Sequence, residues 1–125
     1  MIDADSLIAE RLQSAFPDWH VASEQDPGIT FPAIIFAVSG DGQVGNGPKR
    51  WPLSLAVNIL DDTETVFESV EAVYAEIRSW RGKTSPHGHV VLVADTSLIS
   101  RVASTVVGNR SIQQYAGSFD VLART

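Results

Sequence analysis

Residues Trp51 to Arg81 change their apolar spacing once, and this change restricts the fold more than any other feature of the chain. At first every second residue is apolar, namely Trp51, Leu53, Leu55, Val57 and Ile59. A spacing of two predicts a strand with one buried face. From Val66 to Trp80 the apolar steps become three and four, which predicts a helix with one apolar stripe. The segment therefore predicts a strand that leads into a helix packed on the same sheet.

The predicted helix has an apolar side and an acidic side. The side chains that we expect it to bury are Val66, Phe67, Val70, Val73, Tyr74, Ile77 and Trp80. The acidic side holds Asp61, Glu64, Glu68 and Glu71. Asp61 and Glu64 have the spacing of a capping pair at a helix start, and Gly82 suits the left-handed position that ends a helix. One element is thus expected to offer an apolar face to the core and an acidic face to water or a partner.

The rest of the chain predicts one more helix and several strands. Asp3 to Phe16 has a short apolar stripe and is followed by Pro17, which predicts a helix that ends there. The other predicted strands are Trp19–Ser23, Ala33–Val38 as a central strand, Val90–Ala94, Leu98–Val107 with a break or bulge, and Ile112–Arg124. This order predicts a single α+β domain over residues 1–125. Its sheet is mixed and mainly antiparallel, with about four to five strands and two helices packed on it.

Composition excludes several classes of function. The 125 residues include no cysteine, which excludes disulfides, thiolate metal sites and thiol catalysis. The net charge of −6 disfavours sequence-independent binding of a phosphate backbone. No apolar run approaches the ~20 residues needed to span a bilayer, so no membrane partner is expected. Asp3 and Asp5, with no basic stretch before an apolar core, predict that a secretory signal is absent.

The most glycine-rich stretch, Gly40 to Arg50, matches the dinucleotide pattern GxGxxG at its start. A dinucleotide site needs a helix that opens at once, so that its N-terminus meets the pyrophosphate. Pro48, Pro52 and the predicted strand leave no room for such a helix. We therefore predict a hairpin with a long loop that orders against a partner. Trp51, beside this loop, is the most plausible contact residue of the three tryptophans.

A metal site is the main chemical alternative. His87 and His89 place two imidazoles near each other, and Asp95 is a possible third ligand. Zinc sites usually need three or four fixed ligands with supporting hydrogen bonds, and His20 is the one remaining imidazole. A polar loop is the simpler interpretation. No nucleophile motif such as GxSxG is present, so we expect no enzyme and no cofactor, with a small metal-binding enzyme domain kept as a rival.

Several segments in a fixed order carry a resemblance to a known family. They are Met1–Leu7 with Ala15–Pro17, Phe31–Ile34, Lys49–Trp51, Val66–Trp80 and Tyr115–Val121. With these elements the chain resembles, over essentially its full length, the tail terminator or tail completion proteins of long-tailed bacteriophages and prophages. The family has no invariant catalytic motif, so the resemblance depends on order and spacing.

The resemblance implies a structural role in the virion. Such proteins are small α+β domains that form a hexameric ring on the last ring of tail tube protein. The ring stops tube growth and offers the surface to which head–tail connector proteins dock. DNA passes through its channel without specific binding. The chain would then be made in the host cytoplasm and reside at the head-proximal end of the tail. Head–tail stopper and other neck proteins of comparable size remain alternatives.

The resemblance also implies where contacts between subunits lie, because the long hairpin loop and the sheet edges commonly serve them in this family. The residues to which this carries are Gly42, Gln43, Val44, Asn46, Lys49, Arg50 and Trp51. A closed ring needs different faces of each subunit to meet. We expect the acidic helix side, or the edge of the final strand, to meet Lys49, Arg50 or Arg101 of a neighbour. A host adaptor that binds peptides at a sheet edge is the remaining rival.

Overall fold

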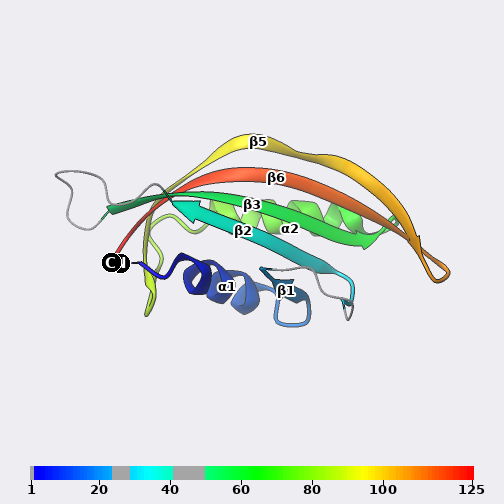
Figure 1. Ribbon diagram of the computed structural model, residues 1–125, viewed down its shortest axis with the longest axis horizontal. Helices are drawn as coiled ribbons and strands as arrows, with labels where there is room; N and C mark the ends of the chain where they lie inside the picture. Colours follow the sequence, from blue (N-terminus) through cyan, green and yellow to red (C-terminus); the bar gives the residue numbers. More distant parts are fainter. Residues whose placement is uncertain (1, 24–28, 41–49) are drawn as a thin grey trace.

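A computed structural model describes residues 2–23, 29–40 and 50–125 of the chain. The fold is α+β, with a mixed six-stranded sheet and two helices (Figure 1). In chain order the elements are α1 (Ala4–Ala15), β1 (His20–Ala22), β2 (Ala33–Gly40), β3 (Arg50–Asp62), α2 (Val66–Arg78), β4 (Thr84–Ser85), β5 (Gly88–Val107) and β6 (Arg110–Arg124). Neither helix is long and apolar enough to cross a bilayer, in the ranges that the structure describes.

The strands lie in the order β1-β2-β3-β6-β5-β4. β1 runs parallel to β2, and each of the other neighbouring pairs is antiparallel. The count of four to five strands was too low, because Thr84–Ser85 of a predicted polar connection add a short edge strand. Val90–Ala94 and Leu98–Val107, predicted as two strands, belong to the single long strand β5. Both helices pack on the same face of the curved sheet.

The predicted alternation in β3 is confirmed. The side chains that β3 buries beneath the helices are Leu53, Leu55, Val57 and Ile59. The sheet in turn buries apolar side chains of α2 and of Trp80, two residues beyond its end. The α2 side chains are Val66, Val70, Val73 and Ile77. Phe67 and Tyr74 were expected in this core and are instead 63% and 36% exposed. They lie one residue to the side of the stripe, about 100° around the helix, where α2 faces solvent rather than the sheet.

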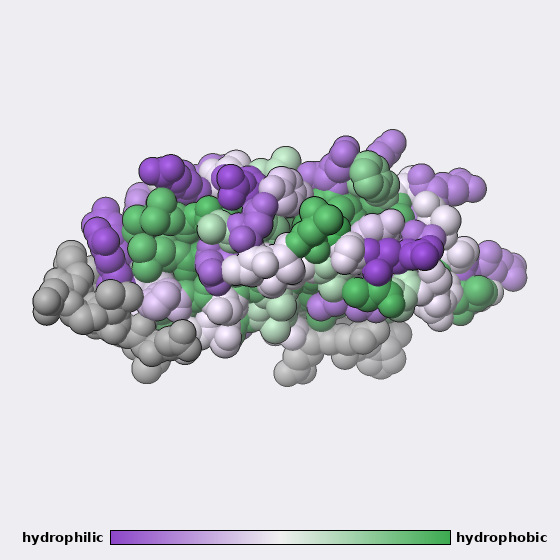
Figure 2. Space-filling view, turned by 90° about the horizontal axis from the view of Figure 1, so that it is seen from above, coloured by the Kyte–Doolittle hydropathy of each residue, from purple (hydrophilic) through white to green (hydrophobic). Residues whose placement is uncertain are grey.

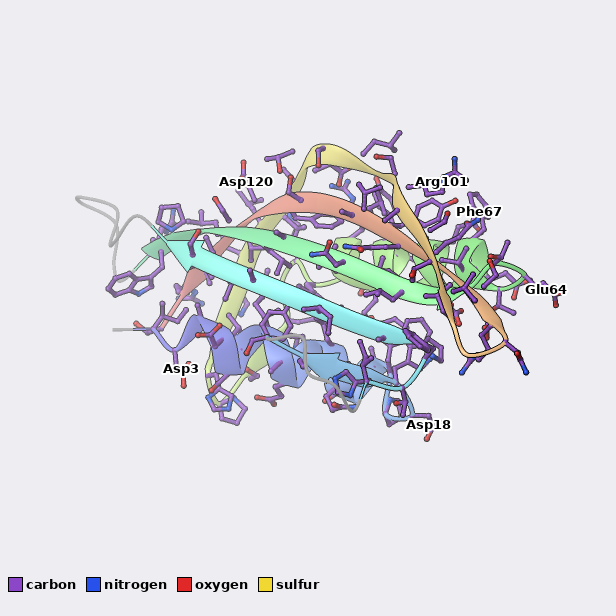
Figure 3. All side chains as sticks on the ribbon, turned by 45° about the vertical axis from the view of Figure 1, so that its right-hand side comes forward. Asp3, Asp18, Glu64, Phe67, Arg101 and Asp120 are labelled. Atoms are coloured by element: carbon purple, nitrogen blue, oxygen red, sulfur yellow. The ribbon has the colours of Figure 1, made fainter. Side chains whose placement is uncertain are left out.

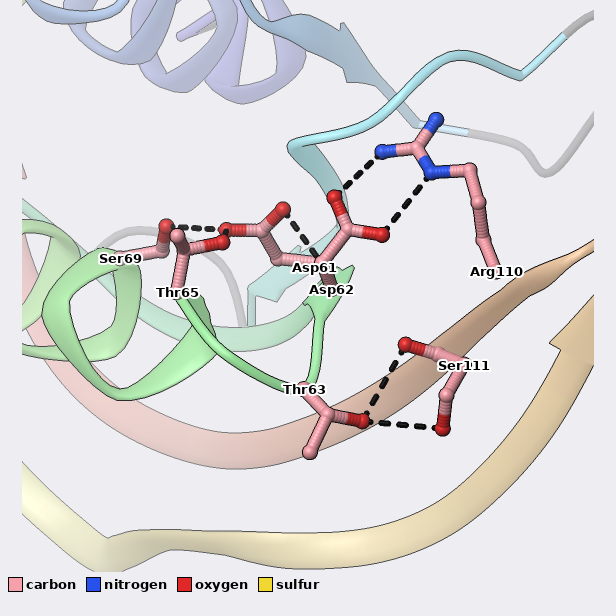
Figure 4. A network of polar contacts seen from close by, with 7 residues as sticks. All are labelled: Asp61, Asp62, Thr63, Thr65, Ser69, Arg110 and Ser111. Carbon is pink, nitrogen blue, oxygen red and sulfur yellow. Dashed lines mark hydrogen bonds and ion pairs between the residues drawn. The ribbon is translucent and has the colours of Figure 1, made fainter.

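The start of α2 differs from the predicted capping pair. Asp61 belongs to β3 and is only 3% exposed, so it is not part of an acidic solvent face. Its carboxylate accepts hydrogen bonds from the Thr65 and Ser69 hydroxyls at 2.9 and 2.7 Å (Figure 4). At the other end, Gly82 has the predicted positive φ of 83°, but α2 already ends at Arg78.

The N-terminal helix follows its prediction closely. Asp3 caps it by accepting a hydrogen bond of 3.1 Å from the Ser6 N–H. Both the Ser6 hydroxyl and this N–H stabilise the ionised carboxylate and lower the pKa of Asp3. Leu7, Ile8 and Leu12 form its buried stripe. α1 therefore covers the β1–β2 end of the sheet, while α2 covers β3 and β5.

The face of the sheet away from the helices carries small and polar side chains. Ser54 and Ala56 of β3 are exposed there, and Asn58 accepts a hydrogen bond of 2.8 Å from the Gln114 amide. At one end a second small core closes this face. It is made of Ala33, Leu60 and Ile112, with Ile29, Phe31 and Ile35 packed against them.

Candidate interaction surface

The predicted hairpin between β2 and β3 is confirmed, because the two strands pair antiparallel up to Gly40 opposite Leu53. The GxGxxG pattern lies almost entirely outside the described residues, and the next described element after Gly40 is a strand that begins at Arg50. Five of the predicted contact residues lie outside the described residues, namely Gly42, Gln43, Val44, Asn46 and Lys49. Arg50 and Trp51 remain from the predicted set.

Arg50 belongs to a basic end of the sheet that also holds Arg124, which the sequence did not single out. In the strand register Arg50 lies opposite Arg124, and Arg124 lies opposite His89. Both arginines are exposed. Like charges placed opposite each other across strands repel, so this end favours an acidic neighbour. Trp51 is half-buried and packs against the main core, which limits its role as a contact residue.

The structure does not bring His87, His89 and Asp95 together. His87 Nε2 lies 3.3 Å from Glu10 Oε2, and His89 Nδ1 lies 2.6 Å from the Thr84 hydroxyl. Asp95 instead accepts a hydrogen bond of 2.6 Å from the Tyr74 hydroxyl. Within the described ranges, no group of three or more His, Cys, Asp or Glu side chains is arranged to hold a metal ion.

An apolar groove runs between α2 and β5, and we call it the α2–β5 groove. It encloses about 400 Å³ and is lined by Phe67, Val70, Glu71, Tyr74, Leu98 and Ile99. Phe67 and Leu98 are its most open walls, with exposed fractions of 63% and 81%. The groove is therefore an apolar surface that the described part of the folded chain leaves open to solvent.

Further exposed apolar side chains follow the same strand. They are Leu92, Val102 and Val106. Figure 2 shows this side of the molecule, where apolar side chains gather between hydrophilic ones. Large apolar side chains that are exposed together, rather than singly, mark interaction surfaces. The sequence hinted at this surface only through the β-branched and leucine residues of Leu98–Val107, and Phe67 and Tyr74 were assigned to the core.

The ends of the groove are polar and charged. The Tyr74 hydroxyl donates to Asp95, and this bond to the anion raises the pKa of Tyr74 because it favours the neutral phenol. Arg78 Nη1 lies 3.5 Å from the same carboxylate. Glu68 is exposed on α2 and Glu64 is exposed in the turn before it, as predicted, and Glu71 joins the groove wall. Figure 3 places Glu64, Phe67 and Arg101 toward the same end of the molecule.

In the described part of the chain, β5 and β2 each have a stretch of edge without a strand partner. β4 pairs only with Gly88 and His89 of β5, and backbone bonds from Gly82 and Lys83 extend this cover to Val90. On the other side, β1 pairs with β2 only over Ala33 to Ile35. β6 lies between β3 and β5, so the predicted contact through an edge of the final strand is wrong.

No model of a known protein family matches the chain, and no curated protein shows significant sequence similarity to it.

Proposed function

We propose that the chain is a structural assembly protein that caps the tail tube of a long-tailed phage or prophage. As a ring of copies, it stops tube polymerisation and provides the surface to which the head docks. The observation that carries this proposal is the position of its open surfaces. In the described ranges of the chain, an apolar groove and an unpaired strand edge lie on the β5 side, and a second unpaired edge lies on the β2 side.

Open surfaces on two different sides are what a ring needs. In a ring each subunit uses one face toward the neighbour before it and a different face toward the neighbour after it. A protein with a single open patch would instead form a closed pair. The α+β architecture also agrees with the fold that the sequence resemblance implies.

The charge of the chain suits a conduit for DNA. A net charge of −6 repels the phosphate backbone at long range. In the proposed ring, the sheet face away from the helices would line the channel, and this face carries small neutral side chains such as Ser54 and Ala56. A ring of this chain would therefore let DNA pass without holding it.

Deletion of the chain from the phage that encodes it tests the proposal. We expect tails whose tubes exceed the normal length and carry no heads. A copy of the gene supplied in trans restores normal tails. Leu98→Glu, which places a charge in the α2–β5 groove, should not restore them. Ser14→Glu is the matched control, because Ser14 is exposed on α1 and outside the groove.

The deletion separates the proposed function from its rivals. Tails of normal length that fail to join heads would assign the chain to another neck protein. Unchanged particles with normal tails and heads would exclude any role in virion assembly.

A further inference from the structure

We propose that the sheet continues from one copy of the chain to the next, with the free edge of β5 paired to the free edge of β2 of the neighbouring copy. The inference rests on the self-assembly in the proposed function and names the contact that produces it. It assigns the contact to backbone edges rather than to the glycine-rich hairpin loop.

The first step is the length of the two edges. β5 has 20 residues, and cover by β4 and the preceding turn ends at Val90. Among the residues that the structure describes, no strand pairs with the outer side of β2 from Phe36 to Gly40. Unpaired strand edges present rows of N–H and C=O groups that pair readily with another strand.

The second step is a slot beside the free edge of β2. A cavity of about 450 Å³ opens where β1 ends, between α1 and β2. The residues that line it are Asp5, Ser6, Ala9, Val21, Ala22, Ser23 and Phe36. Its apolar walls match the exposed leucine and valine side chains that β5 carries, such as Leu98 and Val102.

The third step is charge. Between Thr96 and Val107 the only charged residue of β5 is Arg101, and the only charged residue lining the slot is Asp5. Both are exposed, and neither side chain makes a hydrogen bond or ion pair within the described part of the molecule. Their opposite charges would pair only if one copy's β5 lies at another copy's slot.

The fourth step is direction. Because β2–β3, β3–β6 and β6–β5 are each antiparallel, β2 and β5 of one copy run in opposite directions. Copies that keep the same orientation around a ring therefore bring β5 antiparallel to the neighbour's β2. Pairing of β5 with a second β5 would leave the β2 edge unpaired, and in a register centred near Arg101 it would also bring two like charges together. Register shifts in β5 make its edge irregular, so it favours a matched partner over an arbitrary strand.

Disulfide trapping tests the contact, because the chain has no cysteine of its own. One population carries Ala37→Cys or Ser39→Cys in β2, and a second of different mass carries Ser100→Cys or Ala103→Cys in β5. All four positions are exposed. The Ser54→Cys variant of β3 replaces the β2 variants as the control, because Ser54 is exposed but lies between two paired strands.

The two populations are mixed, oxidised and separated without reductant, both as concentrated purified protein and within purified tails. We expect at least one β2–β5 combination to form mixed dimers at least about tenfold above the Ser54→Cys control. Arg101→Glu in the population with the β5 cysteine should lower the yield of mixed dimers. Asp5→Lys, added in the population with the β2 cysteine, should restore that yield. Mixed dimers no more abundant than the control in both samples would overturn the inference. Preferential cross-links within the β5 population alone would also overturn it, in favour of a symmetric pair.

The result is independent of the test of function. Chains found on tails without a β2–β5 cross-link would leave the proposed function standing and remove this contact. A β2–β5 cross-link in a chain that is never found on tails would support this contact and remove the proposed function.

Discussion

Ser69 on α2 donates a hydrogen bond of 2.7 Å from its hydroxyl to Oδ2 of Asp61, at the end of β3. Thr65 donates to the same oxygen at 2.9 Å, and the Asp62 N–H donates to Oδ1 at 2.8 Å (Figure 4). The carboxylate is buried, at 3% exposure. It thus joins the last residues of β3 to the first turn of α2, which fixes the angle at which the helix meets the sheet.

Replacement of Asp61 should therefore weaken the whole domain. In Asp61→Ala the hydroxyls of Thr65 and Ser69 lose their acceptor, and the buried one at Ser69 is left unsatisfied. We expect a loss of about 1–3 kcal/mol in the free energy of unfolding, measured by urea titration. Glu64→Ala, an exposed carboxylate nearby, should change stability by less than about 0.5 kcal/mol. Equal effects of the two substitutions would contradict the role given to Asp61.

The neighbouring Asp62 predicts a pH dependence. The Arg110 guanidinium donates to its carboxylate, with Nε 2.8 Å from Oδ1, and this hydrogen bond lowers the pKa of Asp62. A lowered pKa stabilises the fold fully above the ordinary aspartate value of about 3.9, and this contribution is lost as pH falls through the lowered pKa. The melting temperature of wild type minus that of Asp62→Asn should be constant near neutral pH and shrink below about pH 4. A difference that does not change down to pH 2 would refute this.

Two positions on α2 separate core from surface. Val70 is 7% exposed beneath the sheet, and Phe67 is 63% exposed in the α2–β5 groove. Val70→Asp should destabilise the domain by at least about 3 kcal/mol or leave it insoluble, because it buries an unpaired charge. Phe67→Asp adds the same charge at the surface and should keep the native melting temperature within a few degrees, while it prevents assembly. A near-native melting temperature for Val70→Asp would reject the packing of α2 on the sheet.

Gly117 of β6 lets β5 approach closely. A Cβ at this position would lie 2.6 Å from Ile99 Cγ1 and 3.0 Å from Ile99 Cα. Gly117→Ala should cost about 1–3 kcal/mol by overpacking, measured by thermal unfolding. In an Ile99→Ala background, Gly117→Ala should cost less than in wild type but still destabilise, because the contact with the residue 99 backbone remains. Wild-type stability in Gly117→Ala would show that the strands separate freely at this point.

Patterns confined to one element predicted the fold well. The alternation in β3 and the stripes of α1 and α2 each follow from a single buried face, so they can be found in the sequence. β5 was predicted as two strands because Asp95, Thr96 and Ser97 interrupt its apolar residues. The structure passes through them with register shifts between Asp95 and Ser100, which keep the strand continuous.

The surface was harder to predict, because it depends on which strands become neighbours. Nothing in the residues of Ile112–Arg124 shows that β6 lies inside the sheet, and so its predicted edge contact was wrong. Phe67 and Tyr74 were assigned to the core because they are apolar and lie beside the apolar stripe of α2. The sequence does not show that the sheet fails to cover that side of the helix. Arg124 was missed beside Arg50 because the two are neighbours only through the β3–β6 register.

The most direct test of the account is electron microscopy of purified tails that carry a label on this chain. A tag at the C-terminus is suitable, because Thr125 is exposed. The account predicts label at the head-proximal tip of each tail and nowhere along the tube. Tails that carry no label at that tip, from particles in which the tagged chain supports normal assembly, would contradict the central claim.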